Sequence, residues 1–342
     1  MAAKKILVTG GAGFIGSHTA VALSVAGYEP VVMDNFSNSE RAVMQGIRKL
    51  AATPVHLLEA DCCNVEALRT VFRDHQPAGV IHFAAFKAVG ESVQQPVKYF
   101  QNNIGSLTAL LQVMPEFSVN DLVFSSSCTV YGVPDSLPVT ENAPVKPAMS
   151  PYGYTKQVCE EAIHYAAAAD GKLRSTLLRY FNPIGAHPSG EIGELPLGVP
   201  NNLVPFITQT AAGMRRELSI FGRDYDTPDG TCIRDYIHVM DLAEAHVRAL
   251  GWLSKAEEGR VEVFNVGTGK GQSVQEVVDT FEEVTGVKVR CVDAQRRPGD
   301  VPVIYADASC AEKELNWRAT RTMADALRDA WNWQQRIGQG KG

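Results

Sequence analysis

The chain has 342 residues, of which 45% are hydrophobic and 20% charged, and it carries a formal net charge of −6. This length suggests about two domains, and this composition excludes a disordered, collagenous or coiled-coil protein. Because 38 acidic residues outnumber 32 basic ones without any basic run, a basic nucleic-acid-binding protein is excluded, and no apolar window of about 18 residues predicts a membrane span.

The N-terminus and the cysteines favour a cytoplasmic chain. Residues 1–8 lead directly into a short apolar run that ends in Thr9-Gly10, without the pattern of a secretory signal. The seven Cys are an odd number, with one adjacent pair, Cys62-Cys63, and no CxxC spacing. This usage predicts reduced thiols in core positions rather than disulfides or a zinc site, so we expect no metal.

Short apolar runs alternate with longer helical patterns in the N-terminal half. Two of the intervening stretches, 16–26 and 102–114, are long enough for crossover helices. The runs predict strands buried on both faces of a parallel sheet, and they cover residues 5–8, 30–33, 55–58, 79–83, 122–125 and 176–180. This alternation predicts an α/β fold with a doubly wound parallel sheet.

The alternation of apolar runs and helical patterns ends after residue 181. Residues 181–205 contain five Pro and four Gly, which predicts a long loop. Beyond it we expect a strand at 218–221, a helix from about 239, a helix from the capping-box pattern Ser273-Val-Gln-Glu276 to about 284, and a last helix at about 323–337. We therefore divide the chain into domains at 1–181 and 182–342, with elements exchanged between them.

A glycine-rich turn follows the first predicted strand. Gly10, Gly13 and Gly16 form a GxxGxxG pattern, which permits a tight turn and close backbone approach to a pyrophosphate at a helix N-terminus. The second strand ends in Asp34, whose carboxylate would bind the adenosine ribose and repel a 2′-phosphate, so we expect NAD rather than NADP. A solvated turn Asp is the alternative. Asp61, after the third strand, either contacts the adenine edge or caps an ordinary turn.

Tyr152 and Lys156 form a Tyr-x-x-x-Lys pattern and would stand on one face of a predicted helix. A phenol has an ordinary pKa of about 10, and we expect the Lys156 ammonium to lower the pKa of Tyr152 toward neutrality. An oxidised nicotinamide ring would add a second positive charge. The pattern alone occurs often by chance. The strand-end run at residues 125–129, Ser-Ser-Ser-Cys-Thr, adds weight, because its hydroxyls would face the same crevice as Tyr152.

Together these features resemble the extended short-chain dehydrogenase/reductase family, and within it the UDP-glucose 4-epimerase family over almost the whole length. The segments that carry this resemblance are VTGGAGFIGSH at 8–18, HFAAFKAVGES at 82–92, SSSCTVYG at 125–132 and RDYIHVMDL at 234–242, with shorter matches at PNNL 200–203 and RPGD 297–300. The His-Val-x-Asp-Leu and KAVGES stretches are more specific than the glycine turn.

The resemblance implies a Rossmann-type NAD-binding domain at 1–181 and a nucleotide-sugar-binding domain at 182–342, in a homodimer. It implies an NAD-dependent isomerase that interconverts UDP-glucose and UDP-galactose through a transient 4-keto sugar and enzyme-bound NADH. Tyr152 would take the proton of the sugar 4-hydroxyl, Ser127 would bridge by a short hydrogen bond, and Lys156 would tune both.

The resemblance also implies two sets of ligand-binding residues. NAD would be bound by Gly10, Gly13, Phe14, Ile15, Gly16, Asp34, Asn35, Asp61, Cys62, Phe83, Ala84, Lys87, Asn102 and Phe181. The nucleotide sugar would be held by Lys87, Ser127, Asn182, Asn202, Leu203, Phe221, Arg234, Arg297, Asp300 and Ile304. Guanidinium groups suit a diphosphate, which favours this role for the two arginines, with ordinary surface charge as the alternative.

Two positions depart from the family pattern. Cys128 stands where relatives often have Ala. Ile304 stands where relatives carry a bulky aromatic or a small residue, at a position associated with room for an N-acetyl group. Acceptance of UDP-N-acetylhexosamines is therefore open.

Three other functions remain as alternatives. A nucleotide-sugar 4,6-dehydratase or decarboxylase on the same scaffold is the first, but a dehydratase needs an acid–base carboxylate where this chain has Cys128 and Thr129. A non-catalytic dinucleotide sensor is disfavoured by the intact Ser127, Tyr152 and Lys156. An ordinary dehydrogenase that releases NADH is the third.

Overall fold

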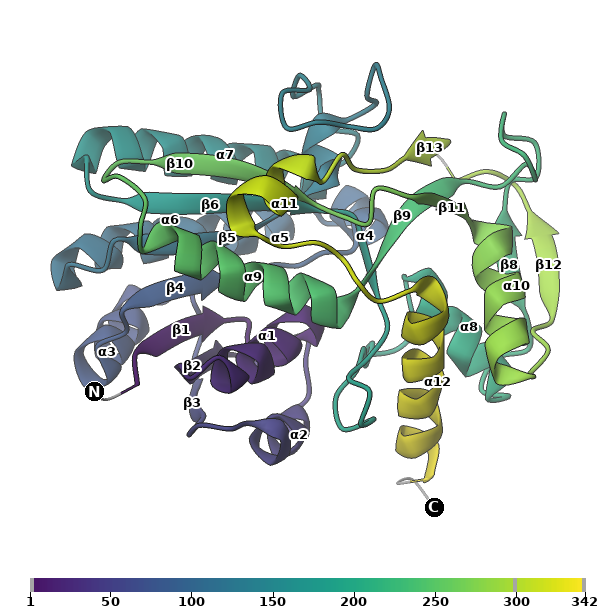
Figure 1. Cartoon of the computed structure of the whole chain (residues 1–342), viewed down its shortest axis with the longest axis horizontal. Helices are drawn as coiled ribbons and strands as arrows, with labels where there is room; N and C mark the ends of the chain where they lie inside the picture. Colours follow the sequence, from purple (N-terminus) through teal and green to yellow (C-terminus); the bar gives the residue numbers. More distant parts are fainter. Residues whose placement is uncertain (1–2, 298–299, 340–342) are drawn as a thin grey trace.

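A seven-stranded sheet, in which all strands run parallel, organises the computed structural model of the chain, which describes residues 3–297 and 300–339 (Figure 1). The strand order is β10-β6-β5-β4-β1-β2-β3. The strands are β1 (Lys5–Thr9), β2 (Glu29–Asp34), β3 (His56–Glu59), β4 (Gly79–His82), β5 (Asp121–Ser127), β6 (Arg174–Tyr180) and β10 (Val261–Val266). The order reverses between β1 and β4, the kind of switch point beside which parallel sheets bind ligands.

The six strands predicted from apolar runs are confirmed, and a seventh was missed. β10 joins the sheet beside β6 although it lies far along the chain. Its sequence, VEVFNV, contains Glu262 and Asn265, which interrupt the apolar run that marks the other strands. Its place in the sheet depends on pairing with β6 rather than on a local pattern.

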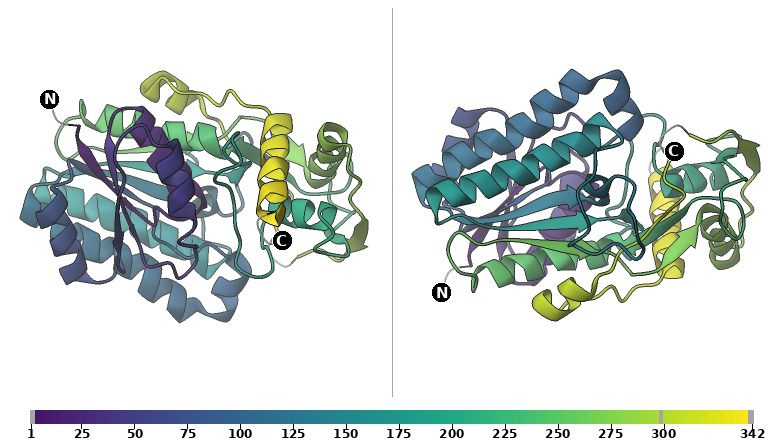
Figure 2. Two further views of the ribbon diagram at one scale, coloured as in Figure 1. Left: turned by 90° about the horizontal axis from the view of Figure 1, so that it is seen from below. Right: turned by 90° about the horizontal axis from the view of Figure 1, so that it is seen from above.

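Helices cover both faces of the sheet (Figure 2). Leu7 packs on one side with α3 (Val65–His75), α6 (Gly105–Val113) and α7 (Pro151–Asp170), whereas its neighbours Ile6 and Val8 pack on the other. The helices of that other face are α1 (Phe14–Val25), α9 (Val239–Leu253) and α11 (Ser309–Leu315), with α2 (Val43–Leu50) beside α1. This alternation is the pattern of strands buried on both faces.

Short helical segments connect several of these elements. They are α4 (Val89–Gln94), α5 (Pro96–Tyr99), the π-helical η1 (Phe100–Ile104) and the 3₁₀ turns η2 (Met114–Phe117) and η3 (Cys128–Tyr131). α5, η1, α6 and η2 follow one another without a break, so the helix predicted at 102–114 lies within a longer helical stretch.

A smaller unit lies at one end of the large sheet (Figures 1 and 2). It contains a four-stranded sheet and a two-stranded sheet, packed with three helices around their own apolar core. The strands are β7 (Asn182–Ile184), β9 (Ile233–His238), β11 (Gly271–Ser273) and β13 (Val303–Ile304), and the pair β8 (Leu218–Phe221) and β12 (Cys291–Ala294). The helices are α8 (Leu203–Ala211), α10 (Val274–Thr285) and α12 (Met323–Gln339).

The stretch 181–205, predicted to be one long loop, contains regular structure at both ends. β7 occupies residues 182–184 because it pairs in parallel with β9, a partner that is distant in sequence. α8 begins at Leu203, and Pro205 lies in its first turn, where a helix needs no backbone N–H donor. The prediction of irregular structure holds only for the residues between these two elements.

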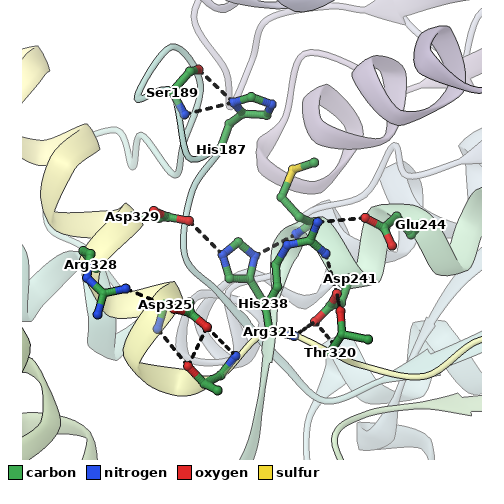
Figure 3. A network of polar contacts seen from close by, with 12 residues as sticks. His187, Ser189, His238, Asp241, Glu244, Thr320, Arg321, Asp325, Arg328 and Asp329 are labelled. Carbon is green, nitrogen blue, oxygen red and sulfur yellow. Dashed lines mark hydrogen bonds and ion pairs between the residues drawn. The ribbon is translucent and has the colours of Figure 1, made fainter.

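Two polar residues of the RDYIHVMDL segment hold α12 against the rest of the molecule (Figure 3). Asp241, in the first turn of α9, accepts hydrogen bonds from the backbone N–H groups of Thr320 (3.1 Å) and Arg321 (2.9 Å) and pairs with the Arg321 guanidinium. His238 Nε2 lies 3.2 Å from Asp329 Oδ2 in α12. This motif therefore has a structural role at the junction between β9, α9 and α12.

Neither membrane spans nor disulfides are present in the described ranges. No helix there is long and apolar enough to cross a membrane. The seven cysteines are free thiols, of which Cys62, Cys128, Cys159 and Cys232 are buried. The expectation of core positions is wrong for Cys63, which is exposed in the turn after β3.

The capping box predicted at the start of α10 is confirmed and gives a stability prediction. The Ser273 hydroxyl accepts the Glu276 N–H at 3.0 Å, and Glu276 accepts the Ser273 N–H at 2.6 Å. We expect Ser273→Ala to lower the free energy of unfolding by about 1–2 kcal/mol, measured by urea denaturation followed by circular dichroism. Ser254→Ala, at an exposed helix end, is the control and should stay within about 0.5 kcal/mol.

Candidate active site

The two halves of the predicted site meet at the carboxyl end of the large sheet. His82, the last residue of β4, lies with its Nδ1 2.7 Å from the hydroxyl of Thr9, the last residue of β1. Its ring stacks on Phe124 of β5, and the Lys156 ammonium lies 4.9 Å from the centre of the same Phe124 ring. The glycine turn after β1 and the Tyr-Lys pair of α7 are thus linked through one packed row of side chains.

The glycine turn packs too closely for larger residues. Gly10 has a φ of +66°, and a Cβ there would lie 2.8 Å from the backbone nitrogen of Ala84. A Cβ on Gly16 would lie 2.4 Å from the Gly10 carbonyl oxygen. α1 then begins at Phe14 without a side-chain cap or an acidic residue in its first turn. Its first N–H groups are therefore suited to an anionic oxygen, as the sequence predicted.

Asp34 is a buried residue that organises the loop beyond β2. Its carboxylate accepts the N–H groups of Ala12 and Phe36 and the Ser39 hydroxyl, each at 2.9 Å. The alternative of a solvated turn Asp is excluded, since the residue is only 8% exposed. Asp34 ties the glycine turn to the loop after β2.

The other predicted cofactor residues lie around the same sheet edge. Asn35 donates to Asp61 Oδ2 at 3.1 Å, so these two act as a pair. The Lys87 ammonium lies 5.8 Å from the centre of the Phe14 ring and 2.8 Å from Glu194 Oε1. Ile15 lies in α1, Cys62 follows β3, Phe83 and Ala84 follow β4, Asn102 lies in η1 and Phe181 follows β6.

The predicted catalytic residues lie where α7 meets the end of β5. Ser150 is the N-cap residue of α7, and its hydroxyl accepts the Gly153 N–H at 3.1 Å, which places Tyr152 in the first turn. Lys156 is 4% exposed, and its ammonium donates to the Ser125 carbonyl at 2.6 Å. It lies 6.0 Å from the centre of the Tyr152 ring. The Ser127 hydroxyl accepts hydrogen bonds from the N–H and the hydroxyl of Thr129.

Burial dominates the electrostatics of this pair. It raises the pKa of Tyr152 to about 12, against an opposing hydrogen bond with Ser127. It lowers the pKa of Lys156 to about 8, against the opposing charges of Cys159 and Glu160. The expectation that Lys156 by itself lowers the Tyr152 pKa toward neutrality is therefore wrong. The cost of removing the phenolate from water exceeds what an ammonium bonded to a backbone carbonyl returns.

The predicted nucleotide-sugar residues come from the smaller unit. Arg234 of β9 lies 3.6 Å from Asp300, and the Arg297 guanidinium stacks 3.9 Å above the Phe221 ring at the end of β8. Asn182 opens β7, Asn202 is the N-cap residue of α8, and Leu203 is the first residue of that helix. Two residues of the RPGD segment, Pro298 and Gly299, lie outside the described residues.

The two positions that depart from the family pattern, Cys128 and Ile304, lie in one apolar cluster beside the predicted site. Cys128 and Ile304 are both buried in a small apolar cluster that also contains Val130, Tyr131, Val139, Phe181 and Ala306. Ile304 pairs with Arg234 in the register of β13 and β9. This apolar cluster therefore connects the end of β5, where Ser127 lies, to β13 of the smaller unit.

Several polar residues that contact the site have no recognisable sequence motif. Glu160 and Arg179 form a buried ion pair beside Ser126. Glu194 accepts hydrogen bonds from both Lys87 (2.8 Å) and Asn202 (2.6 Å) on the same carboxylate oxygen. The spacing of Glu160, one turn after Lys156, is the one local signal for this group. The other contacts join residues that lie far apart in the sequence.

The chain is similar to known proteins over almost its whole length. The GDP-mannose 4,6 dehydratase family model matches residues 7–330. UDP-glucose 4-epimerase 2 of Arabidopsis thaliana is 50% identical over 334 residues, which cover 97% of this chain and 95% of the relative. This chain belongs to the UDP-glucose 4-epimerase family. It also belongs to the wider family that the dehydratase model describes.

Solved structures of the UDP-glucose 4-epimerase family share the fold. The enzyme from Stenotrophomonas maltophila, with bound NAD and formylated UDP-arabinopyranose, has a TM-score of 0.95 at 46% identity, covering 98% of this chain and 99% of that one. The Bifidobacterium longum enzyme, in complex with NAD+ and UDP, has a TM-score of 0.95 at 43% identity, covering 98% and 100%. Family membership confirms the resemblance drawn from the motifs and the doubly wound fold.

Proposed function

We propose that this chain interconverts UDP-galactose and UDP-glucose, with NAD as a firmly held cofactor. The observation that carries the proposal is the meeting of Tyr152, Ser127 and Lys156 with the glycine turn at one sheet edge. Relatives that are about half identical over nearly the whole chain are UDP-glucose 4-epimerases, which supports the same activity here.

The residues at the sheet edge fit a dinucleotide. The glycine turn offers backbone N–H groups without side chains that would block a pyrophosphate, and Asp34 stands where a ribose would lie. Lys87 adds a positive charge beside Phe14. When bound, NAD⁺ supplies a hydride acceptor and a positive charge beside the phenol. The cofactor is regenerated in each turnover, so the reaction consumes none.

Tyr152 takes the proton of the sugar 4-hydroxyl in this proposal. With a pKa of about 12, its phenol is protonated at neutral pH in the protein alone, so additional positive charge is required to make it a base. Lys156 contributes part of that charge, and Ser127 passes the proton through its hydroxyl. The two groups act together, since Lys156 is itself fixed by the Ser125 carbonyl.

The substrate is held through its UDP portion. Arg234 and Arg297 would bind the diphosphate, and Asn182, Asn202 and Leu203 would line the nucleotide side. The hexose must then stay loosely bound, because the 4-keto sugar has to turn its other face to the hydride. This division supports a nucleotide-sugar-binding domain at 182–342 and an NAD-binding domain at 1–181, with β10 and α9 contributed from the second to the first.

The residues after Ser127 favour an epimerase over a 4,6-dehydratase. Cys128 and Thr129 occupy the positions where a dehydratase needs a carboxylate to exchange protons with the sugar. Cys128 is also buried, and burial raises the pKa of its thiol to about 12, so it cannot replace such a carboxylate as an acid near neutral pH.

The first prediction concerns the proposed base. We expect Tyr152→Phe to lower the rate of UDP-galactose conversion by at least about 100-fold, because the phenyl ring can neither take nor return the proton. The assay measures UDP-glucose formed from UDP-galactose by purified protein without added NAD⁺. Tyr154→Phe is the matched control, since Tyr154 lies on the same helix but is 51% exposed.

Three outcomes would contradict this function or the role of Tyr152 in it. Absence of UDP-glucose from the wild-type reaction would exclude the epimerase. Accumulation of free NADH during turnover would identify an ordinary dehydrogenase. Equal activity of Tyr152→Phe and the wild type would remove Tyr152 from the chemistry.

The second prediction concerns the hexose pocket. Ile304 is buried in the same apolar cluster as Cys128, so we propose that its size sets the room for an N-acetyl group. We expect Ile304→Tyr to lower kcat/KM for UDP-N-acetylgalactosamine relative to UDP-galactose by at least about 10-fold. Val303→Ile, at the neighbouring position, which is less buried than Ile304, should leave the ratio unchanged. An unchanged ratio in Ile304→Tyr would place the pocket elsewhere.

The third prediction concerns assembly. We propose a cytoplasmic homodimer formed through the helices that flank α7, because Val93 and Val97 there are 61% and 63% exposed. Light scattering should give twice the 37.1 kDa mass of one chain. Val97→Asp should give the mass of one chain, whereas Val25→Asp, on the opposite face of the sheet, should not. A single-chain mass for the wild type would refute the dimer.

A further inference from the structure

Glu160 extends the row of functional residues along α7. It lies four residues after Lys156 and eight after Tyr152, so all three stand on the same helix face. Unlike most acidic residues of the chain, it is almost completely buried, with 5% exposure. A buried carboxylate requires partners of opposite charge or several hydrogen bonds.

The partners of Glu160 come from two neighbouring strands. Arg179 of β6 donates from Nε to Oε1 at 2.9 Å and from its terminal nitrogen to Oε2 at 2.5 Å, a bidentate pair. Ser126 of β5 donates its hydroxyl to Oε1. Ser126 and Arg179 are direct partners in the parallel pairing of β5 and β6. One carboxylate therefore fastens the ends of two strands to the helix.

Three successive residues of β5 lie against three residues of α7. The Ser125 carbonyl accepts from Lys156, and Ser126 donates to Glu160. Ser127 lies close enough to Tyr152 to oppose the rise of the phenol pKa. The Ser126–Glu160 hydrogen bond has no part in proton transfer. It fixes the end of β5 along α7, and so it determines how Ser125 is aligned with Lys156 and Ser127 with Tyr152.

Arg179 is also connected, through Tyr131, to a third strand. Its guanidinium lies 4.7 Å from the centre of the Tyr131 ring, and the Tyr131 hydroxyl donates to Asn265 of β10 at 2.7 Å. Burial opposes the charge of Arg179, but the hydrogen bonds and charge of Glu160 outweigh it, so the pKa of Arg179 lies above its ordinary value. The Glu160–Arg179 pair thus connects α7, β6 and, through Tyr131, β10 inside the protein.

Glu160 also acts on the charge of Lys156. The titratable groups around Lys156 are Tyr152, Cys159 and Glu160 from α7 and His82 from β4, and Arg179 of β6 is paired with Glu160. His82 is neutral near pH 7, since burial and the Lys156 charge lower its pKa to about 3. The negative charge of Glu160 raises the pKa of Lys156 against the lowering by burial.

We infer that Glu160 is a positioning residue for the reaction, which together with Arg179 holds the end of β5 against α7 and so aligns Ser125 and Ser127 with Lys156 and Tyr152. The inference rests on the proposed function, because it concerns the alignment of Tyr152, Ser127 and Lys156. It assigns to Glu160 no contact with the substrate or the cofactor.

Two variants separate the charge of Glu160 from the tie that it forms. Glu160→Gln keeps the shape but removes the charge, so we expect kcat for UDP-galactose to fall by at least about 10-fold while KM changes little. Lys156 is charged below its pKa, and loss of the neighbouring carboxylate lowers that pKa. The alkaline limb of the kcat profile should therefore move to lower pH, by at least about half a unit.

Ser126→Ala removes the tie and keeps the ion pair. Ser126→Ala should lower kcat several-fold without moving the alkaline limb of the kcat profile. Glu160→Asp restores the negative charge, so its alkaline limb should lie at the pH of the wild type rather than at the lower pH of Glu160→Gln. Glu161→Gln, at the exposed neighbour, is the matched control and should match the wild type. Thermal unfolding of each purified variant reports whether the fold is retained.

The outcomes distinguish the inference from the proposed function. If the wild type does not convert UDP-galactose, the proposed function fails whatever the variants do. If the wild type converts it, and folded Glu160→Gln and Ser126→Ala both match it in kcat and pH profile, the positioning role alone is refuted. If Glu160→Gln does not fold, a wild-type kcat of Ser126→Ala refutes the role, and a lowered kcat with unchanged KM supports it.

Discussion

The packing of α7 against the carboxyl ends of β5 and β6 is the contact on which the site depends. Ser125 and Ser126 are hydrogen-bonded to Lys156 and Glu160 on one helix face, and Ser127 lies beside Tyr152 on the same face. The strands are themselves paired within a seven-stranded sheet, so these contacts fix α7 relative to the whole sheet. Catalytic hydroxyls held in this way need little further ordering when a substrate binds.

Burial makes this arrangement costly and useful at the same time. It raises the pKa of Tyr152 and lowers that of Lys156, so each group is shifted away from its charged form. Both groups then respond strongly to any charge placed beside them, because little water screens it. The net charge of −6 describes the whole chain and does not show which charged groups lie at the site. Lys87 and Arg234 face the site with acidic partners, Glu194 and Asp300, at 2.8 and 3.6 Å.

Recognisable motifs and functional contacts coincide only in part. The RDYIHVMDL segment is among the most specific in the chain, yet His238 and Asp241 within it hold α12 and residues 320–321 in place. Conversely, Glu160 and Arg179 adjoin the catalytic residues but belong to no motif. A structural junction can thus be as distinctive in sequence as a binding site.

The sequence by itself determined the features that depend on local spacing. These are six strands of the sheet, the glycine turn, the capping box of α10 and the common helix face of Tyr152 and Lys156. Only the tertiary structure decided that β10 completes the sheet, that β7 forms within the Pro- and Gly-rich stretch, and that Glu160 and Arg179 fasten β5 and β6 to α7. The Tyr152 pKa belongs to this second group, because it depends on how deeply neighbouring elements bury the phenol. Strand pairing and burial are properties of segments brought together from far along the chain, and no short window of residues contains them.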